Sequence, residues 1–311
     1  MTAASMDRRP SEGRGGSIYD LGYRGYEGPR LGRRAAIWAL LAHSVRTAYG
    51  LGRSARSKVM PVGLAVLAIL PSMLALGILM LVTTLNAPAE VVEAFSPVAY
   101  STIFPFIAIL VFLFCASQAP ELFGRDQQMG VLPLYFSRAV GRLDYAAARL
   151  LGLFTSLLVL VLVPYLLLLV GRVLVAPDLF EGLAEELPSA PAALGVALMT
   201  AAVVGTLSSA VASLTPRRSY ATVAIIAVFL VPNIVASSLV ALDTGLVGQI
   251  AAVLSPPDVL DGVNAYLFDA RPDNITVLRA GNDGWVYVVA AFAWIAGSLA
   301  VLARRYRTMV V

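Results

Sequence analysis

One polar segment of the sequence, residues 121–149, combines charged side chains with large apolar ones. Such a mixture suits docking onto another protein, because arginine and aromatic side chains supply much of the binding energy at protein interfaces. A connector that lies along a membrane surface is the alternative. The residues that we expect to form the docking patch are Glu121, Arg125, Leu132, Leu134, Phe136, Arg138 and Arg142.

Residue patterns for catalysis are missing from the sequence. It contains no glycine-rich phosphate-binding loop, no serine-nucleophile motif and no cluster of His and Cys. His43 and Cys115 are the only residues of their types, so neither a metal site nor an internal disulfide is expected. The sequence therefore predicts no catalytic residue, no metal and no cofactor on this chain, and it disfavours an intramembrane enzyme.

A stripe of small residues recurs at every fourth position in one apolar stretch. Small side chains on one face let two membrane helices approach closely. Packing inside the chain and contact with a second subunit both fit this pattern. The stripe consists of Ala197, Ala201, Gly205, Ser209 and Ser213.

The elements that must position these residues are apolar helices. Hydrophobic residues make up 59% of the chain and charged residues 14%, and the mean hydropathy is +0.79. Because about 20 apolar residues cross a membrane as a helix, six such stretches predict an all-α integral membrane protein. None of them carries a charged residue, which argues against an ion relay through carboxylates. The stretches are residues 59–85, 98–117, 150–171, 192–214, 220–242 and 285–303.

Basic residues gather in alternate connecting segments. These segments lie before the first stretch, between the second and third, between the fourth and fifth, and after the last. The other connecting segments are mainly acidic. Since basic segments stay in the cytoplasm, both ends of this multi-pass chain are predicted to be cytoplasmic. The net charge of +4 follows from this topology and indicates no binding of nucleic acid.

The remaining segments have their own patterns. Residues 1–34 are predicted to be a partly disordered cytoplasmic segment, and residues 304–311 a cytoplasmic tail. Residues 35–58 combine helical periodicity with basic side chains, which favours an amphipathic helix at the membrane surface over a cytoplasmic helix packed on a partner. Residues 243–284 form a long external loop, and its apolar halves around Pro256 and Pro257 fit either a re-entrant hairpin or an external cap.

The polar segment resembles the connector between the second and third spans in permeases of ABC-2 type ATP-binding-cassette transporters. In that family an acidic residue, a basic residue and a leucine-rich stretch ending in Ser-Arg-Pro precede a second Arg and a Lys. Here Ala139 replaces the Pro and Arg149 replaces the Lys, and both changes leave the charge pattern intact. The N-terminal Tyr-Asp-Leu-Gly-Tyr-Arg segment resembles actinobacterial members. The matching residues are Glu121, Arg125, Leu132, Leu134, Ser137, Arg138, Arg142 and Arg149.

This resemblance implies a six-helix, type V exporter-like permease in the bacterial plasma membrane. It implies a second permease chain, in a homodimer or heterodimer, and a separate ABC ATPase subunit that holds ATP and Mg and contacts the polar segment. The chain itself would have no enzymatic activity, and membrane lipid would surround its spans. The sequence does not name the cargo, and apolar spans without buried charges allow a lipid, a hydrophobic drug or a peptide. A non-transporting membrane scaffold or assembly protein is the alternative function.

Cysteine labelling from outside the cell should reach residues 181 and 258 but not residues 128 or 217, because the first two lie in acidic connecting segments. The measurement is labelling of single-cysteine variants in intact cells. Permeabilised cells are the control that residues 128 and 217 can react. Labelling of residue 217 in intact cells would contradict the predicted topology.

Overall fold

The computed structural model describes residues 28, 31–52, 54–85, 99–137 and 140–309. The chain divides into two units, Met1–Leu31 and Gly32–Val311. The second unit contains every helix of the described residues, and all regular elements among these residues are helices.

Six helices in the described part of the chain are long and apolar enough to cross a membrane, judged by their length and composition. The prediction of an all-helical protein with six such spans is confirmed to that extent. The fourth, Leu179–Leu214, consists of α7 (Leu179–Glu186), a 3-10 turn η1 (Leu187–Ser189) and α8 (Ala190–Leu214). The others are α2 (Ala55–Thr84), α4 (Tyr100–Gln128), α6 (Arg142–Val175), α9 (Arg218–Ala241) and α13 (Gly284–Thr308).

Several of these helices extend beyond the apolar stretches of the sequence. Helix α4 continues to Gln128, and α6 begins at Arg142. The two helices therefore carry charged residues such as Asp126 and Arg149, whereas the apolar stretches carry none. The expectation of spans without charge holds for the stretches but is wrong for the whole helices.

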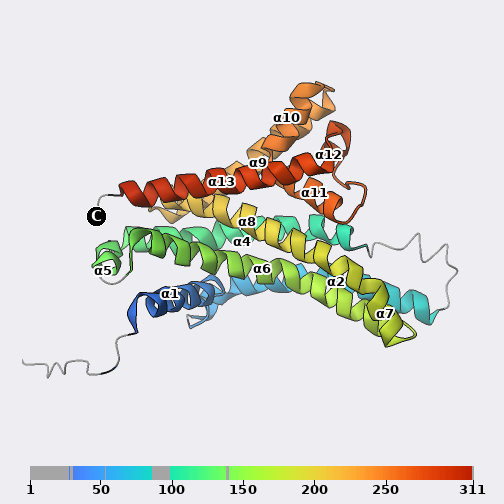
Figure 1. Cartoon of the computed structure of the whole chain (residues 1–311), viewed down its shortest axis with the longest axis horizontal. Helices are drawn as coiled ribbons and strands as arrows, with labels where there is room; N and C mark the ends of the chain where they lie inside the picture. Colours follow the sequence, from blue (N-terminus) through green and yellow to red (C-terminus); the bar gives the residue numbers. More distant parts are fainter. Residues whose placement is uncertain (1–27, 29–30, 53, 86–98, 138–139, 310–311) are drawn as a thin grey trace, which may run out of the picture. The chain divides into compact units, whose positions relative to one another are not determined.

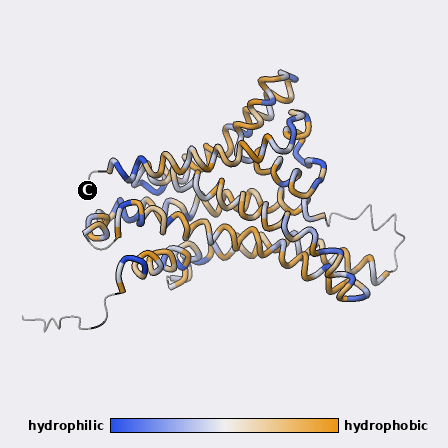
Figure 2. Tube along the Cα trace, in the orientation of Figure 1, coloured by the Kyte–Doolittle hydropathy of each residue, from blue (hydrophilic) through white to orange (hydrophobic). Residues whose placement is uncertain are grey.

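Helices α6 and α8 form the centre of the bundle (Figure 1). Helix α8 packs against α4, α6 and α13, while α6 also packs against α2. In the most apolar part of the fourth span 67% of the residues are buried, compared with 17% in α2. Helix α2 therefore presents most of its apolar surface outward, as a lipid-facing helix does. Hydrophobic residues run along the long helices, and hydrophilic residues gather near their ends (Figure 2).

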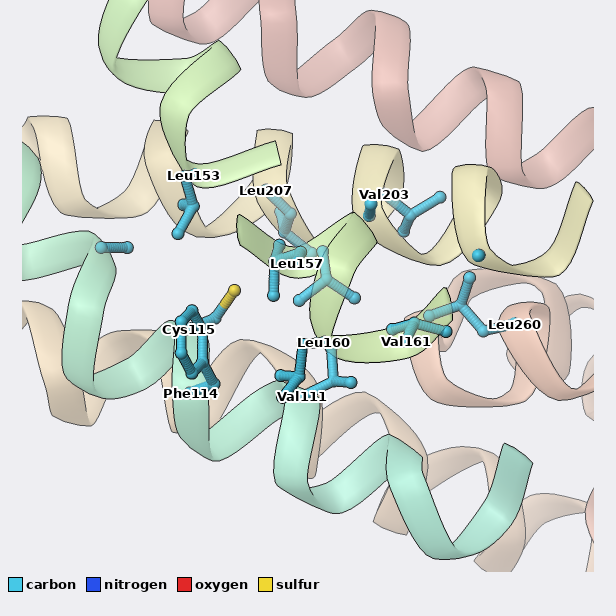
Figure 3. Packing of buried hydrophobic residues seen from close by; sticks show 14 of the residues in the cluster. Val111, Phe114, Cys115, Leu153, Leu157, Leu160, Val161, Val203, Leu207 and Leu260 are labelled. Atoms are coloured by element: carbon cyan, nitrogen blue, oxygen red, sulfur yellow. The ribbon is translucent and has the colours of Figure 1, made fainter. Parts of the chain in front are cut away.

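The core lies where α4, α6 and α8 meet (Figure 3). Phe114 and Cys115 from α4, Leu157 from α6 and Val203 from α8 are all fully buried there. The single cysteine therefore faces the core of the chain. Because the side chains come from three spans, this cluster fixes the mutual positions of those spans.

The first helix, α1 (Gly32–Ala48), is shorter than the helix predicted over residues 35–58. Gly50 has a φ of +66°, the left-handed conformation that glycine adopts easily. Its N–H donates to the Thr47 carbonyl, and the N–H of Leu51 donates to the Arg46 carbonyl. This pair of hydrogen bonds is a Schellman motif, which ends a helix at a glycine. Residues 55–58 consequently belong to α2.

Helix α1 packs on α6 through Leu40, Ser44, Thr47 and Ala48, which are its buried residues. Two of them carry hydroxyl groups, so a search for apolar periodicity does not find this face. The contact is close at Gly152 of α6, where an added Cβ would lie 2.4 Å from the Cβ of Ser44. Helix α1 is therefore an integral part of the bundle.

The stripe of small residues lies on the buried side of α8. Ala197, Ala201, Ser209 and Ser213 are fully buried within the chain. A Cβ added at Gly205 would lie 3.4 Å from Cδ1 of Leu157 in α6. The stripe therefore serves packing between α8 and its neighbours inside this chain.

The segment between α9 and α13 folds into three short helices, α10 (Leu246–Leu254), α11 (Pro256–Leu267) and α12 (Ile275–Ala280). Helix α11 packs against α13, α8, α4 and α9, near the end of the bundle where α4 begins (Figure 1). Asp258 in its first turn is fully buried. A reagent outside the cell would not reach residue 258, so the prediction that this residue is labelled is wrong. Glu181, by contrast, is exposed.

Gly152→Ala should destabilise the protein by about 1–3 kcal/mol, because the new methyl group overlaps Ser44 and pushes α1 away from α6. The matched control is Gly63→Ala in α2, where an added Cβ meets nothing within 4 Å. This control should match or exceed wild-type stability. The measurement is thermal unfolding in detergent. Equal melting temperatures for the two variants would contradict the close contact.

Candidate functional site

The segment predicted as a docking patch lies at the basic end of the bundle. Glu121 and Arg125 belong to the last turns of α4, and α5 (Leu132–Phe136) forms a short helix between α4 and α6. Arg142 is the first residue of α6 and is exposed. Arg138 lies outside the described residues. The structure thus brings α5 and the adjoining ends of α4 and α6 to one place (Figure 1).

Glu121 is held between two arginines of its own chain. Its Oε1 lies 3.1 Å from Nη1 of Arg125, and its Oε2 lies 3.2 Å from Nη1 of Arg218 at the start of α9. Only 16% of the Glu121 side chain is exposed. In this arrangement the carboxylate joins α4 to α9. Arg125 and Arg218 are much more exposed and present positive charge at the surface.

A buried ion pair between Arg149 of α6 and Asp126 of α4 lies just inside this surface. Only 4% of the Arg149 side chain and 16% of the Asp126 side chain are exposed. Tyr145 donates a hydrogen bond of 2.7 Å to the same Oδ2 of Asp126. Arg149 also donates through Nη1 to Oγ of Ser44 in α1, at 3.3 Å. One guanidinium thus connects three helices.

This pairing follows from the cost of burying charge. An unpaired ion in a low-dielectric interior costs several kcal/mol, so a buried arginine needs a carboxylate and further acceptors. Asp126, Ser44 and the hydroxyl of Tyr145 supply them, and the Tyr145 ring lies 5.3 Å from the guanidinium carbon. The guanidinium therefore restrains α1, α4 and α6 in one arrangement.

Helix α5 rests on this buried pair through aromatic contacts. The ring centroids of Tyr135 and Phe136 lie 5.3 Å and 5.9 Å from that of Tyr145. The guanidinium carbon of Arg142 lies over the Phe136 ring, 6.0 Å from its centroid. Leu132 is buried, whereas Leu134 is 67% exposed. Helix α5 thus has one side fixed to the bundle and one apolar side chain directed away from it.

The last span reaches the same site. Tyr306 of α13 is fully buried, and its ring centroid lies 5.8 Å from that of Tyr145. Arg305 of α13 and Gln127 of α4 both donate to the carbonyl of Ser213 in α8, each at 3.3 Å. A cleft of about 320 Å³ separates α5 from the end of α13. Its lining residues are Gln127, Gly130, Leu132, Pro133, Pro216, Arg305 and Met309.

A second ion pair fastens the beginning of α1. Arg33 donates through Nε and Nη2 to the two carboxylate oxygens of Asp144, at 2.8 and 2.7 Å. Asp144 also accepts from the N–H of Gly141, directly before α6. The forked geometry fixes direction as well as distance. Helix α1 is therefore tied to α6 at both of its ends.

Sequence reasoning missed the buried partners in this site. Asp126, Tyr145 and Ser44 received no role, although Asp126 belongs to the same polar segment. The signal that was available is Arg149, an arginine next to an apolar stretch, since such a residue requires a carboxylate within reach. Choosing between Asp126 and Asp144 requires the three-dimensional packing.

Apolar grooves flank α4 on its outer side. One of about 430 Å³ lies between α4 and α9, with the stacked rings of Phe112 and Phe229 in its wall and Asn233 as a polar member. Another, of about 330 Å³, lies between α2 and α4. Such grooves suit an apolar molecule or an acyl chain.

The described residues contain no group of three or more His, Cys, Asp or Glu side chains placed to hold a metal ion. Comparison of the sequence with family models gave no match, and comparison with curated proteins gave no significant match. The interpretation of the site therefore depends on its geometry and on the sequence pattern.

Asp126→Leu should cost about 3–5 kcal/mol of stability, because it leaves the Arg149 charge buried without its carboxylate. The double variant Asp126→Leu, Arg149→Met should recover much of that loss, since both charges are then gone. Denaturant unfolding in detergent gives these values.

Arg125→Met is the control, because it removes an exposed ion pair that is worth about 0–1 kcal/mol. If Asp126→Leu were no more harmful than this control, the pair would not restrain the three helices.

Proposed function

We propose that this chain is the permease subunit of an ABC-2 type transporter and that it exports its cargo. ATP hydrolysis would take place on a separate ATPase subunit, with ATP and Mg bound there. Two permease chains, identical or different, would lie side by side in a bacterial plasma membrane, with both termini of each chain in the cytoplasm.

The observation that carries this proposal is the arrangement of α5. A short helix at the basic end of a membrane bundle exposes Leu134, while Tyr135 and Phe136 pack on Tyr145 and Arg142 lies over the Phe136 ring. An exposed leucine on a helix at the basic end of the bundle suits an apolar groove with an acidic rim on a partner. Movement of such a partner would reach the buried Tyr145 through α5.

The buried ion pair offers a path from that contact to the spans. Tyr145 shares Asp126 with Arg149, and Arg149 holds Ser44 of α1. Packed side chains and ion pairs of this kind move as a unit, because the interior resists local deformation. Closure of the ATPase dimer would thus reach α1, α4 and α6 together.

The residues of the predicted docking patch would then have two roles. Leu134 and Arg142 would touch the ATPase, since both are exposed. Glu121 and Leu132 would position them from within the chain, because one bridges α4 and α9 and the other is buried. Arg125 is exposed as well and could touch the ATPase, whereas Phe136 is partly buried.

Apolar cargo would follow the grooves beside α4. The groove between α4 and α9 is lined almost entirely by hydrocarbon and aromatic side chains. A lipid, a hydrophobic drug or an apolar peptide could leave the bilayer there without exposing its apolar surface to water.

Leu134→Glu should weaken binding of the ATPase by about 2 kcal/mol or more, roughly 30-fold in Kd, because it puts a charge into an apolar contact. The measurement is ATP hydrolysis and recovery of a subunit with a phosphate-binding loop after purification of the tagged chain. Leu187→Glu is the matched control, since Leu187 is also exposed, at 56%, but lies at the opposite end of the bundle.

Two outcomes would argue against the proposal. If no such ATPase accompanies the wild-type chain, the chain is better described as a scaffold. If Leu134→Glu and Leu187→Glu behave alike, α5 is not the contact with the ATPase.

A further inference from the structure

A second group of buried charges lies at the opposite end of the bundle, in α11. Asp258 and Asp261 are three residues apart and therefore lie on one face of this helix. They are 0% and 7% exposed. Two carboxylates this close and this dry repel each other when both are ionised.

Asp258 joins α11 to two neighbouring segments. Its Oδ1 accepts a hydrogen bond of 3.0 Å from Nδ2 of Asn233 and one of 2.9 Å from Nδ2 of Asn274. Asn233 lies about two helical turns inside α9, and Asn274 caps α12. The position of α11 against α9 and α12 therefore depends on this carboxyl group.

Polar atoms without partners surround the pair. Oδ2 of Asp258 and the hydroxyl of Tyr165 in α6 are buried and have no hydrogen-bond partner among the described residues. Tyr165 is only 1% exposed and lies close enough to Asp261 to interact with its charge. Buried polar atoms are seldom left unpaired, so these oxygens mark an unusually demanding environment for two carboxylates.

The two carboxylates have no basic partner in the part of the chain that the structure describes. Among the described residues, no salt bridge joins either of them to Lys, Arg or His. The start of a helix usually favours a carboxylate through free N–H groups, but Pro256 and Pro257 lack this hydrogen. The first turn of α11 therefore offers Asp258 little help.

The arginines of α4, α9 and α13, which pack on α11, lie at the far ends of those helices. Helices α8 and α10 contain no ionisable residue, and those of α9 lie at its far end. Tyr165 of α6 and Tyr287 of α13 face the pair, together with Asp273 before α12. Tyr100 begins α4, and Arg279 of α12 forms no salt bridge with either carboxylate.

We propose that Asp258 and Asp261 form a proton-binding site, and that loss of its proton loosens the attachment of α11 to α9 and α12. A metal ion does not suit the site, because the amide groups of Asn233 and Asn274 direct N–H donors at Asp258. A proton on Asp261 removes the repulsion and leaves Asp258 free to accept both amides.

The direction of the pH effect follows from the acidity of the pair. Burial, and then the charges of Asp258 and Asp273, raise the pKa of Asp261 from 3.8 to about 7. Burial also raises the pKa of Asp258. A raised carboxyl pKa means that the folded state holds its proton more tightly than the unfolded state. The contribution of Asp261 to stability therefore falls as the pH rises from about 4 to about 7.

The test is the melting temperature of the full-length chain in detergent, measured between about pH 5 and about pH 8. The wild type should lose several degrees over this interval. Asp261→Asn, which resembles the protonated group, should keep the wild-type melting temperature of low pH throughout. Asp269→Asn is the matched control, because Asp269 is exposed and should leave the wild-type pH dependence intact.

An infrared measurement keeps the proposal testable if Asp261→Asn does not fold. The wild type at neutral pH should show the carbonyl band of a buried protonated carboxylic acid, and Asp258→Asn should shift or remove it. Absence of the band, or parallel pH profiles for Asp261→Asn and the wild type, would overturn the proposal. A melting temperature at high pH that rises with sodium but not with choline would also overturn it, since a metal ion would then neutralise the pair.

Discussion

The contacts at the basic end of this protein depend on the buried positive charge of Arg149, which needs a carboxylate partner. Arg149 is removed from water by the packing of three helices, so its guanidinium requires Asp126, Tyr145 and Ser44 as neighbours. Helix α5 packs on Tyr145, and α13 reaches the same ring. A strong local requirement thus fixes the contacts of helices that are distant in the sequence. The proposed route from an ATPase to the spans follows these contacts.

Buried charged side chains have different partners at the two ends of the bundle. At the basic end, opposite charges are paired and the hydrogen bonds around Arg149 are largely complete. At the other end, Asp258 and Asp261 are two carboxyl groups close to a third, Asp273, and Asp258 accepts hydrogen bonds from two amides. The first arrangement is insensitive to pH near neutrality, because arginine stays charged there. The second arrangement changes with protonation, so it suits a response to pH. The first suits the transmission of movement between helices.

The spans were predictable from the sequence because hydrocarbon imposes length and composition on each helix separately. The end of α1 was also readable in principle, since Gly50 and Gly52 follow its last turn. What the sequence did not reveal are pairings between helices. Ser44 and Gly152 look unremarkable alone, and their contact arises only when α1 lies on α6. Asp258 was taken for a residue of an exposed loop, because burial by α9 and α12 is a tertiary property.

The hydrogen bond from Arg149 to Ser44 joins residues that are 105 positions apart in the chain. During synthesis, α1 leaves the ribosome well before α6 exists, so its hydroxyl-bearing face has no receptor until the third span is in the membrane. Docking of α1 therefore follows the synthesis of α4 and α6. A chain truncated before α6 would lack the partner of this face, so the packing of α1 depends on a segment that is synthesised more than 100 residues later.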